Sequence, residues 1–243
     1  MLDFRDNMAK LIKEISVFFP AYNLESKIEK TVKDAFEAIP KLAEKYEVIV
    51  VNDGSSDKTG EKLADLKDKF KNLEIITHKV NRGYGAALKS GFYNSKYTFI
   101  AFTDADGQFD ISELQKLIRL QKKTNADLVV GFYFKRAVKF YRKVNTWFWQ
   151  LIVRLLFGLN VRDIDCGFKL IRKKVLDTIP GLESERGAFI SSEFLIKAQK
   201  AGFKIVETGV HHYPHVGGKG TGADVNVIIK SFVDLFRLWR KLR

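Results

Sequence analysis

The feature that most constrains the fold of this chain is an alternation of short apolar runs with amphipathic stretches of helical period. Val48–Val51 is apolar at every position, which is typical of a strand buried on both faces of a parallel sheet. In residues 26–39 the apolar side chains recur every three to four positions, the period of a helix with one buried face. Because the two patterns alternate through the first half, they predict an α/β fold, a mostly parallel sheet flanked by helices.

The same patterns place the remaining elements. Further strands are predicted at residues 14–19, 73–77, 97–102, 126–131 and 205–210. Further helices are predicted at residues 59–70, 85–95, 192–201 and 225–241, and one more begins at Ser112 as its N-cap. No repeat or low-complexity linker interrupts the chain, so residues 1–243 are expected to form one domain. Its first half covers about residues 14–131, and the second half, residues 132–243, begins with a stretch rich in aromatic and basic side chains.

The composition limits the partners. A formal net charge of +13 over 243 residues requires an anionic partner: nucleic acid, lipid headgroups or a phosphorylated substrate. Cys166 is the only cysteine, which excludes an intrachain disulfide. No apolar stretch reaches the ~20 residues of a membrane-spanning helix, and residues 1–13 lack the apolar core of a signal peptide. We therefore expect a soluble or peripheral protein on the cytoplasmic side of a membrane.

Three polar, turn-forming segments follow predicted strands. They are Pro20–Asn23, Asn52–Asp57 and Thr103–Gln108. Ligands of open α/β sheets bind beyond the carboxyl ends of the strands, which meet at one edge. The three segments therefore predict a single shared site.

Asp104 and Asp106 give the most specific prediction for this site. Two carboxylates spaced i, i+2 at a strand end can hold one hard cation, and Mg²⁺ binds in this way together with phosphate oxygens of a substrate. Mn²⁺ fits the same ligands. The alternative is that both are loop-capping aspartates, which the two matching segments upstream make less attractive.

Asp53 directly follows a buried strand. Its carboxylate can accept a hydrogen bond from a base N–H, and Gly54 permits a tight turn with close approach of the backbone to a ligand. The alternative is an Asx turn, since Asn-Asp-Gly-Ser is turn chemistry in any case. The two interpretations are compatible.

Six segments together resemble a known family. They are Phe19–Asn23, Val51–Thr59, Asn81–Leu88, Asp104–Gln108, Asp163–Lys169 and His212–His215. In this order they resemble the family-2 glycosyltransferases of the GT-A fold, which is Rossmann-like, and especially the polyprenyl-phosphate type related to dolichyl-phosphate mannose and glucose synthases. The resemblance covers about residues 14–240. It implies an inverting enzyme that moves a hexose from a UDP- or GDP-sugar to a polyprenyl phosphate.

The resemblance also implies roles for individual residues. The donor nucleotide would lie against Pro20, Ala21, Tyr22, Glu25, Asp53, Gly54, Asp104, Ala105 and Gln108. Asp106, with Asp104, would bind Mg²⁺ or Mn²⁺. On this interpretation residues 14–131 bind the nucleotide-sugar and residues 132–243 face the acceptor and the membrane. Two positions depart from the family's pattern: Leu24 precedes Glu25 where the family has an acidic residue directly, and His215 stands where it often has arginine.

The acceptor side is expected in the second half. A phosphate monoester is already ionised at pH 7, so it needs cations rather than a general base. The residues expected to hold the acceptor phosphate are Arg136, Arg142, His212 and His215. Glu193 matches an acidic position of the family and would act as a base or orient a cation, so the expected catalytic set is Asp104, Asp106, Arg142 and Glu193. The alternative for Glu193 is a surface glutamate at a helix N-terminus, favoured by the helix dipole.

Two segments suit a membrane surface. Residues 147–157 are aromatic and aliphatic and follow a basic cluster, and residues 232–243 mix apolar and basic side chains. Both compositions are typical of helices that lie in a bilayer interface. The alternative is that they bury their apolar sides in the core or in a dimer interface. Self-association and a membrane-protein partner both stay open.

Three other functions compete with this one. A soluble glycosyltransferase acting on a polysaccharide or protein would need a true base, for which Glu193 is the best candidate. A nucleic-acid-binding protein explains the charge but not the acidic loops, so no nucleic acid partner is expected. A nucleotidyltransferase would carry a Gly-rich, lysine-bearing loop after the first strand, and this chain has Pro20–Asn23 there instead. The nucleotide, the sugar, the length of the lipid and the choice between Mg²⁺ and Mn²⁺ stay open.

Overall fold

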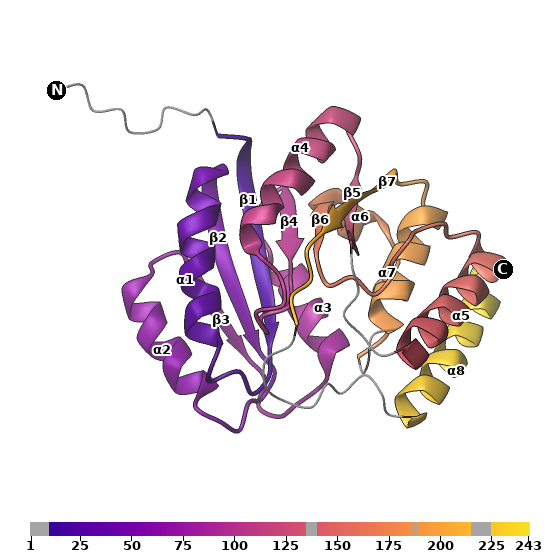
Figure 1. The fold of residues 1–243 in the computed structure, drawn as a ribbon, viewed down its shortest axis with the longest axis horizontal. Helices are drawn as coiled ribbons and strands as arrows, with labels where there is room; N and C mark the ends of the chain where they lie inside the picture. The colour runs from indigo at the N-terminus through magenta and orange to yellow at the C-terminus, as the bar shows by residue number, and fades with distance from the viewer. Residues whose placement is uncertain (1–9, 135–139, 186, 188, 215–224) are drawn as a thin grey trace.

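The computed structural model describes residues 10–134, 140–185, 187, 189–214 and 225–243 (Figure 1). The described part forms a seven-stranded sheet in the order β3-β2-β1-β4-β6-β5-β7. The strands are β1 (Ile12–Ala21), β2 (Ala43–Asn52), β3 (Leu73–Thr77), β4 (Phe99–Phe102), β5 (Leu128–Tyr133), β6 (Lys169–Arg172) and β7 (Ile205–Val210).

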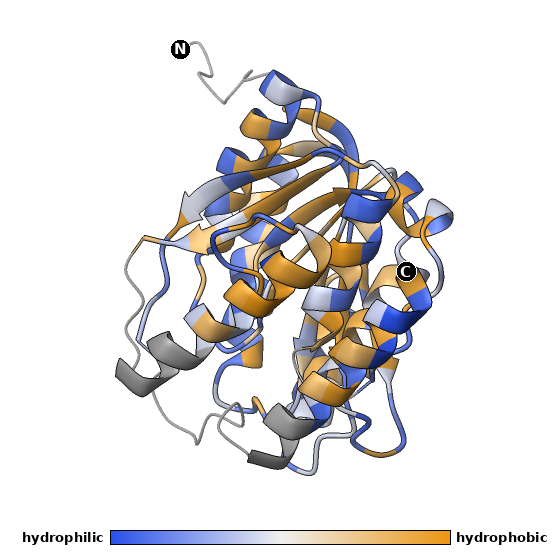
Figure 2. Cartoon of the chain, turned by 90° about the vertical axis from the view of Figure 1, so that its right-hand side faces the viewer, coloured by the Kyte–Doolittle hydropathy of each residue, from blue (hydrophilic) through white to orange (hydrophobic). Residues whose placement is uncertain are grey.

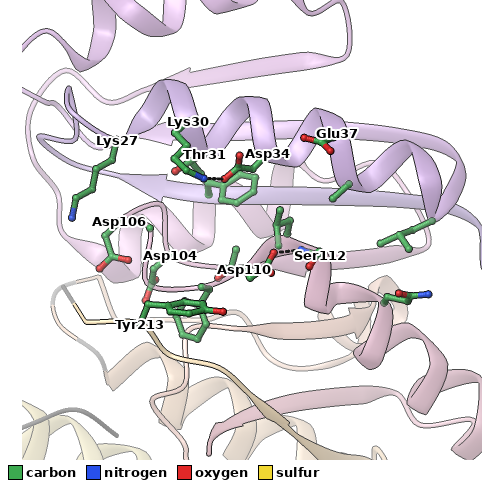
Figure 3. A pocket seen from close by; sticks show the side chains of 18 of the residues that line it. Lys27, Lys30, Thr31, Asp34, Glu37, Asp104, Asp106, Asp110, Ser112 and Tyr213 are labelled. Carbon is green, nitrogen blue, oxygen red and sulfur yellow. Dashed lines mark hydrogen bonds and ion pairs between the residues drawn. The ribbon is translucent and has the colours of Figure 1, made fainter. Parts of the chain in front are cut away.

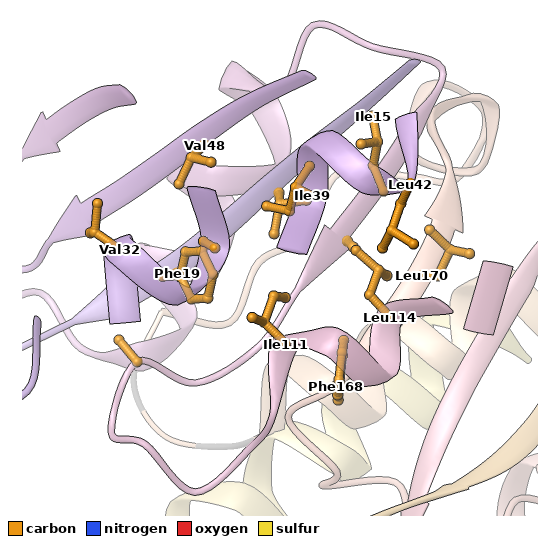
Figure 4. Close-up of a cluster of buried hydrophobic side chains, with 14 of the residues drawn as sticks. Ile15, Phe19, Val32, Ile39, Leu42, Val48, Ile111, Leu114, Phe168 and Leu170 are labelled. Atoms are coloured by element: carbon orange, nitrogen blue, oxygen red, sulfur yellow. The ribbon is translucent and has the colours of Figure 1, made fainter. Parts of the chain in front are cut away.

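Helices cover both faces of the sheet, as the sequence predicts. They are α1 (Ile28–Ala38), α2 (Thr59–Lys69), α3 (Tyr84–Asn94), α4 (Leu114–Thr124), α5 (Phe140–Phe157), α6 (Lys173–Thr178), α7 (Phe189–Lys200) and α8 (Val225–Leu242). Apolar residues of α1, α2 and α4 share one buried cluster with β1 (Figure 4). Residues of α3, α5, α6, α7 and α8 share a second cluster. The sheet is therefore buried on both faces, which is why its central strands are continuously apolar.

Alternate residues of β1 point to the two clusters. Val17 and Phe19 belong to the first cluster and Phe18 to the second. Phe18 stacks on Phe102 with ring centroids 5.2 Å apart and meets Phe92 of α3 edge-on at 5.1 Å. This aromatic group leaves no room at Gly91, where a Cβ would overlap the Phe18 ring.

β6 is the main element that the sequence patterns do not predict. It pairs antiparallel with both β4 and β5, whereas the other described strand pairs are parallel. Its four residues begin with Lys169, whose side chain is fully buried. A short strand that opens on a charged residue has no apolar periodicity to detect.

The predicted elements agree with the structure in kind, and some of their ends move. Residues 73–77 and 205–210 form strands with the predicted bounds. The strand predicted at 126–131 is shifted to Leu128–Tyr133, because it pairs with β7 over those six residues. Ser112 is wrong as an N-cap: the side chain of Asp110 accepts a hydrogen bond from the Ser112 N–H, and a 3₁₀ turn at Ile111–Glu113 precedes α4.

We expect Gly91→Ala to lower the free energy of unfolding by about 1–3 kcal/mol, because the added methyl must displace a packed aromatic ring. Gly60→Ala is the matched control, since Gly60 also lies in a helix but is exposed. The control should be neutral or stabilising, because alanine favours helix. Urea unfolding of both variants measures the difference, and equal stabilities would contradict the packing described.

Candidate active site

The loops after β1 and β2 are locked together by side chain to backbone hydrogen bonds. The Asn23 N–H donates to the Ser55 hydroxyl at 2.9 Å, and the Asn23 side-chain oxygen accepts from the Ser56 N–H at 2.8 Å. Glu25 accepts from the Lys58 N–H at 3.0 Å and its own N–H donates to Asp57 at 3.0 Å. Glu25, which lies one residue later than the acidic position of the family, therefore has a structural role, because its hydrogen bonds hold the two loops together.

Of the three residues at the end of β1, only Tyr22 presents its side chain to solvent. Pro20 and Ala21 are buried in the last two positions of the strand. Tyr22 is exposed beyond it. A nucleobase at this edge would therefore contact the Tyr22 side chain, whereas Pro20 and Ala21 contribute shape through their backbone.

The Asp53 carboxylate is enclosed rather than open to a ligand. Asp53 is only 3% exposed. It accepts hydrogen bonds from the N–H groups of Arg82 at 2.9 Å and Gly83 at 2.7 Å. His78 Nδ1 lies 2.6 Å from the same carboxylate. The Asp53 oxygens thus hold the turn that leads into α3, which agrees with the turn interpretation, and a contact with a nucleobase stays a prediction.

His78 is a part of the site that sequence reasoning missed. It follows β3 directly, with Nδ1 toward Asp53 and Nε2 2.8 Å from the Ser90 hydroxyl. Since a carboxylate only accepts, Nδ1 carries the proton in this pair. The signal in the sequence was a histidine placed at a strand end, opposite an aspartate at the end of the neighbouring strand.

Gly54 allows the turn after β2 to contact the segment after β3. Its φ is +67°, and a Cβ there would overlap the backbone of Val80 and Asn81. A left-handed conformation and the lack of space both require glycine at this position. The tight turn expected at Gly54 is therefore present, and the backbone that approaches it closely is that of Val80 and Asn81.

Asp104 and Asp106 lie at the end of β4, where the sequence predicts them. Tyr84 of α3 donates its hydroxyl to Asp104 at 2.9 Å. Asp106 accepts from the Gln108 N–H at 3.0 Å. Burial and then the Asp106 charge raise the pKa of Asp104 to about 7, although the Tyr84 hydrogen bond and the Lys169 charge act in the opposite direction. Two carboxylates are thus held together against their repulsion.

The donor set fits a divalent cation that takes most of its ligands from a substrate. Among the described residues no group of three His, Cys, Asp or Glu side chains could hold a metal ion. Asp104 and Asp106 alone match Mg²⁺ or Mn²⁺, which bind through one or two carboxylates with phosphate oxygens and water. A cation would also relieve the repulsion that raises the pKa of Asp104.

Lys169 stabilises the segment 164–167, which packs against these carboxylates. Its ammonium donates to the carbonyl oxygens of Ile164, at 3.2 Å, and of Cys166. Burial lowers the pKa of Lys169 and raises that of the Cys166 thiol to about 12, so the thiol is not a nucleophile. A Cβ on Gly167 would overlap the Asp104 carboxylate, so this segment packs directly against the acidic pair.

Gln108 connects the acidic loop to the segment after β7. The Tyr213 N–H donates to the Gln108 carbonyl at 2.9 Å, and the Gln108 side chain donates to the Tyr213 carbonyl at 3.1 Å. His212 packs edge-on against Tyr133 at 4.4 Å and Phe109 at 5.4 Å. His212 therefore lies close to the acidic loop, inside an aromatic group.

Glu193 is buried and lies away from solvent. It accepts from the N–H groups of Glu183 at 2.8 Å and Ser184 at 2.9 Å, and it pairs with Lys197 at 2.6 Å. Both of its oxygens are occupied, which disfavours a base role. Glu193 is 2% exposed, so the surface-glutamate alternative is wrong. A role in orienting a cation stays a prediction. The segment that Glu193 holds packs on α3, where the Ala86 N–H donates to the Glu185 carbonyl at 2.9 Å.

The other acceptor residues expected from the sequence lie outside the part of the chain whose side chains are described. Arg136 and His215 are not among the described residues, and of Arg142 only the backbone, in α5, is described. Their contact with an acceptor phosphate stays a prediction.

A groove of about 810 Å³ runs between α1 and α4 and reaches the acidic pair. Figure 3 shows Lys27 and Lys30 on its α1 side, with Asp104 and Asp106 on the facing loop. The hydroxyl of Thr31, which also lines the groove, donates to the Ala105 carbonyl at 3.0 Å. One end of the groove therefore brings cations and carboxylates together at the carboxyl edge of the sheet, where ligands of open α/β sheets bind.

The sequence matches a known family. The family model described as Glycosyl transferase family 2 matches residues 16–179. A dolichyl-phosphate beta-glucosyltransferase of Dictyostelium discoideum is 30% identical over 217 residues, 81% of this chain and 65% of that protein. The Homo sapiens protein of the same name is 29% identical over 226 residues, 85% of this chain and 69% of its own.

Solved structures share the fold. A glucosyl-3-phosphoglycerate synthase from Mycobacterium tuberculosis, bound to Mn²⁺ and UDP, superposes with a TM-score of 0.63 at 18% identity, covering 95% of this chain and 77% of that one. A mannosyltransferase from Pyrobaculum calidifontis, bound to GDP-Man and Mn²⁺, gives 0.65 at 18%, covering 92% and 64%. These likenesses confirm the GT-A fold expected from the sequence.

We expect Tyr84→Phe to weaken Mn²⁺ binding by about tenfold, the usual effect of losing an outer-shell partner. Removing the hydroxyl raises the pKa of Asp104 further above about 7, and protons then compete better with the metal. The deficit should be larger near pH ~6.5 than near pH ~8.5, as measured by calorimetric titration. Tyr93→Phe, on the same helix and away from Asp104, is the control. A deficit of equal size at both pH values would rule out this explanation.

Proposed function

The chain belongs to glycosyl transferase family 2, and we propose that it is an inverting, metal-dependent enzyme that moves a hexose from a nucleotide-sugar to a polyprenyl phosphate. Relatives from organisms as distant as Dictyostelium and human carry the name dolichyl-phosphate beta-glucosyltransferase. Glucose is therefore the first sugar to test, with UDP-glucose as donor, since a neighbouring structure holds UDP.

The observation that carries this proposal is the acidic pair at the carboxyl edge of the sheet. Asp104 and Asp106 are held close enough for burial and mutual repulsion to raise the pKa of Asp104 to about 7. A bound Mg²⁺ or Mn²⁺ ion would neutralise the charge that develops on the leaving diphosphate. Lys27, which lines the same groove, would add positive charge near the phosphates, whereas Lys30 is paired with Asp34 at 2.5 Å.

The reaction needs no general base. A phosphate oxygen of the acceptor attacks the anomeric carbon from the face opposite the diphosphate, and the carbon–oxygen bond to the diphosphate breaks with its electron pair. The acceptor is already ionised near neutral pH. This agrees with the structure, in which Glu193, the best candidate for a base, is buried and paired with Lys197. The alternative, a soluble enzyme acting on a polysaccharide or protein hydroxyl, needs a general base, and the buried Glu193 is poorly placed to serve as one.

A membrane-facing surface supports a lipid acceptor. Val153 and Phe157 of α5 are buried in the core, whereas Trp147 and Leu155 of the same helix are 62% and 75% exposed. On α8, Leu235 and Leu238 are buried and Phe236 is exposed. Each helix therefore buries one apolar side in the core, and the apolar side chains left outside support the proposal that the helices also meet a bilayer.

The two helices form one surface. Trp149 of α5 meets Phe232 of α8 with ring centroids 5.2 Å apart, and Figure 2 shows the helices side by side with apolar stretches along both. Arg240 adds positive charge on α8, whereas Arg237 pairs with Asp234 and Lys241 with Glu183. In the described part of the chain, no helix is both long and apolar enough to cross a bilayer. We propose that this surface lies on the cytoplasmic leaflet, which accounts for the net charge without nucleic acid.

The transfer assay tests the function directly. Protein, Mn²⁺ or Mg²⁺, radiolabelled UDP-glucose and polyprenyl phosphate in detergent should give label in the organic phase, and chelation should abolish it. We expect Asp106→Asn to reduce the rate by on the order of 10²–10³, as loss of one stabilising charge at a transition state does.

Asp68→Asn is the control, because Asp68 is an exposed aspartate on α2. It should keep the wild-type rate. Hydrolysis of the donor with no lipid product would mean that the glycosyltransferase uses another acceptor. Transfer that survives both chelation and Asp106→Asn would exclude a role for the metal ion in the reaction.

A further inference from the structure

A second cavity lies beneath the outer side of α5, separate from the groove that holds the acidic pair. Its volume is about 480 Å³. Four residues of α5, at positions i, i+3, i+4 and i+7, form one wall: Trp147, Gln150, Leu151 and Arg154. The segment 159–162 and Glu207 of β7 form the other wall. The two cavities share none of the residues that line them.

The cavity is basic and rich in donors. Arg162 stacks its guanidinium on the Phe132 ring, with the central carbon 4.6 Å from the ring centroid. Arg154 is exposed, and no described carboxylate pairs with its guanidinium. A stacked arginine keeps its N–H edge available for a planar or tetrahedral oxyanion, and Arg154 lines the same cavity as Arg162.

Glu207 reduces this positive charge without cancelling it. One of its oxygens accepts from the Arg162 N–H at 2.6 Å. Burial raises the pKa of Glu207. Two arginines and one carboxylate line the cavity, so their formal charges leave one positive charge in excess. That excess suits a phosphodiester, which carries a single negative charge.

The cavity opens beside exposed apolar side chains. Phe148 and Leu155 lie on α5 next to the stripe that lines it and are both exposed. Trp147 is itself a lining residue and is mostly exposed. A ligand with an anionic head and hydrocarbon tails would therefore place its head against Arg154 and Arg162 and its tails along Phe148 and Leu155.

We propose that this cavity binds the headgroup of an anionic bilayer phospholipid, of the phosphatidylglycerol class, and so fixes the depth and orientation of α5 at the membrane. The phosphodiester would accept from the two guanidinium groups, and the glycerol hydroxyls would meet Gln150 and Asn160, which also line the cavity. The inference rests on the proposed attachment of α5 and α8 to the bilayer, and it is independent of which sugar or acceptor the enzyme uses.

The test compares binding of the full chain to phosphatidylcholine vesicles with and without about 30% phosphatidylglycerol, measured by co-sedimentation. Diffuse attraction to an anionic surface depends on charge alone, whereas a guanidinium fork is lost on changing arginine to lysine. We expect Arg154→Lys to weaken the phosphatidylglycerol-dependent binding by about fivefold or more, and Arg154→Gln by about tenfold or more. Arg119→Lys, at an exposed position of α4 outside the α5 and α8 surface, is the matched control and should bind as the wild type does.

Three outcomes would overturn the proposal. In the first, Arg154→Lys binds as tightly as the wild type, which means that the surface attracts lipid through charge alone. In the second, vesicles with polyprenyl phosphate in place of phosphatidylglycerol, at equal charge, bind more tightly and depend on Arg154, which makes the cavity an acceptor site. In the third, inorganic phosphate at about 10 mM displaces the protein from the vesicles, which makes it a site for free phosphate. Arg154 is exposed, so thermal melts of the variants should match the wild type.

Discussion

The parallel pairing of β1 with β2 on one side and β4 on the other is the constraint on which the rest of the molecule depends. It brings the polar segments after three strands to the same edge of the sheet, so residues far apart in the chain become neighbours. The loops after β1 and β2 then bond to each other through Asn23 and Glu25. The acidic pair after β4 is set beside them on a framework that is already rigid.

Buried charges complete that framework. Asp53 holds the turn before α3, Lys169 holds the segment that packs against Asp104, and Glu193 holds the segment that packs on α3. Each is satisfied by backbone groups, which is the condition for burying a charge without a large penalty. All three support α3 or the segment that packs against Asp104, so buried charged residues position the elements around the acidic pair.

The acidic pair and the surface proposed to meet the membrane lie in different parts of the molecule. The acidic pair and the groove between α1 and α4 lie over one part of the sheet, whereas α5 and α8 form the opposite end of the molecule (Figure 1). On this proposal, the basic side chains of α5 and α8 would meet an anionic surface without competing with a metal ion for the carboxylates.

The sequence by itself determined the fold class, most of the strands and helices, and the position of Asp104 and Asp106, because apolar periodicity and turn chemistry are local properties. It did not determine β6, since four residues that begin with the buried Lys169 carry no pattern. Nor did it determine the roles of Asp53, His78 and Glu193, because whether a carboxylate faces a ligand or a backbone N–H depends on which distant segment packs against it. Only the tertiary structure decides that, because burial and hydrogen-bond partners are set by contacts between residues far apart in the chain.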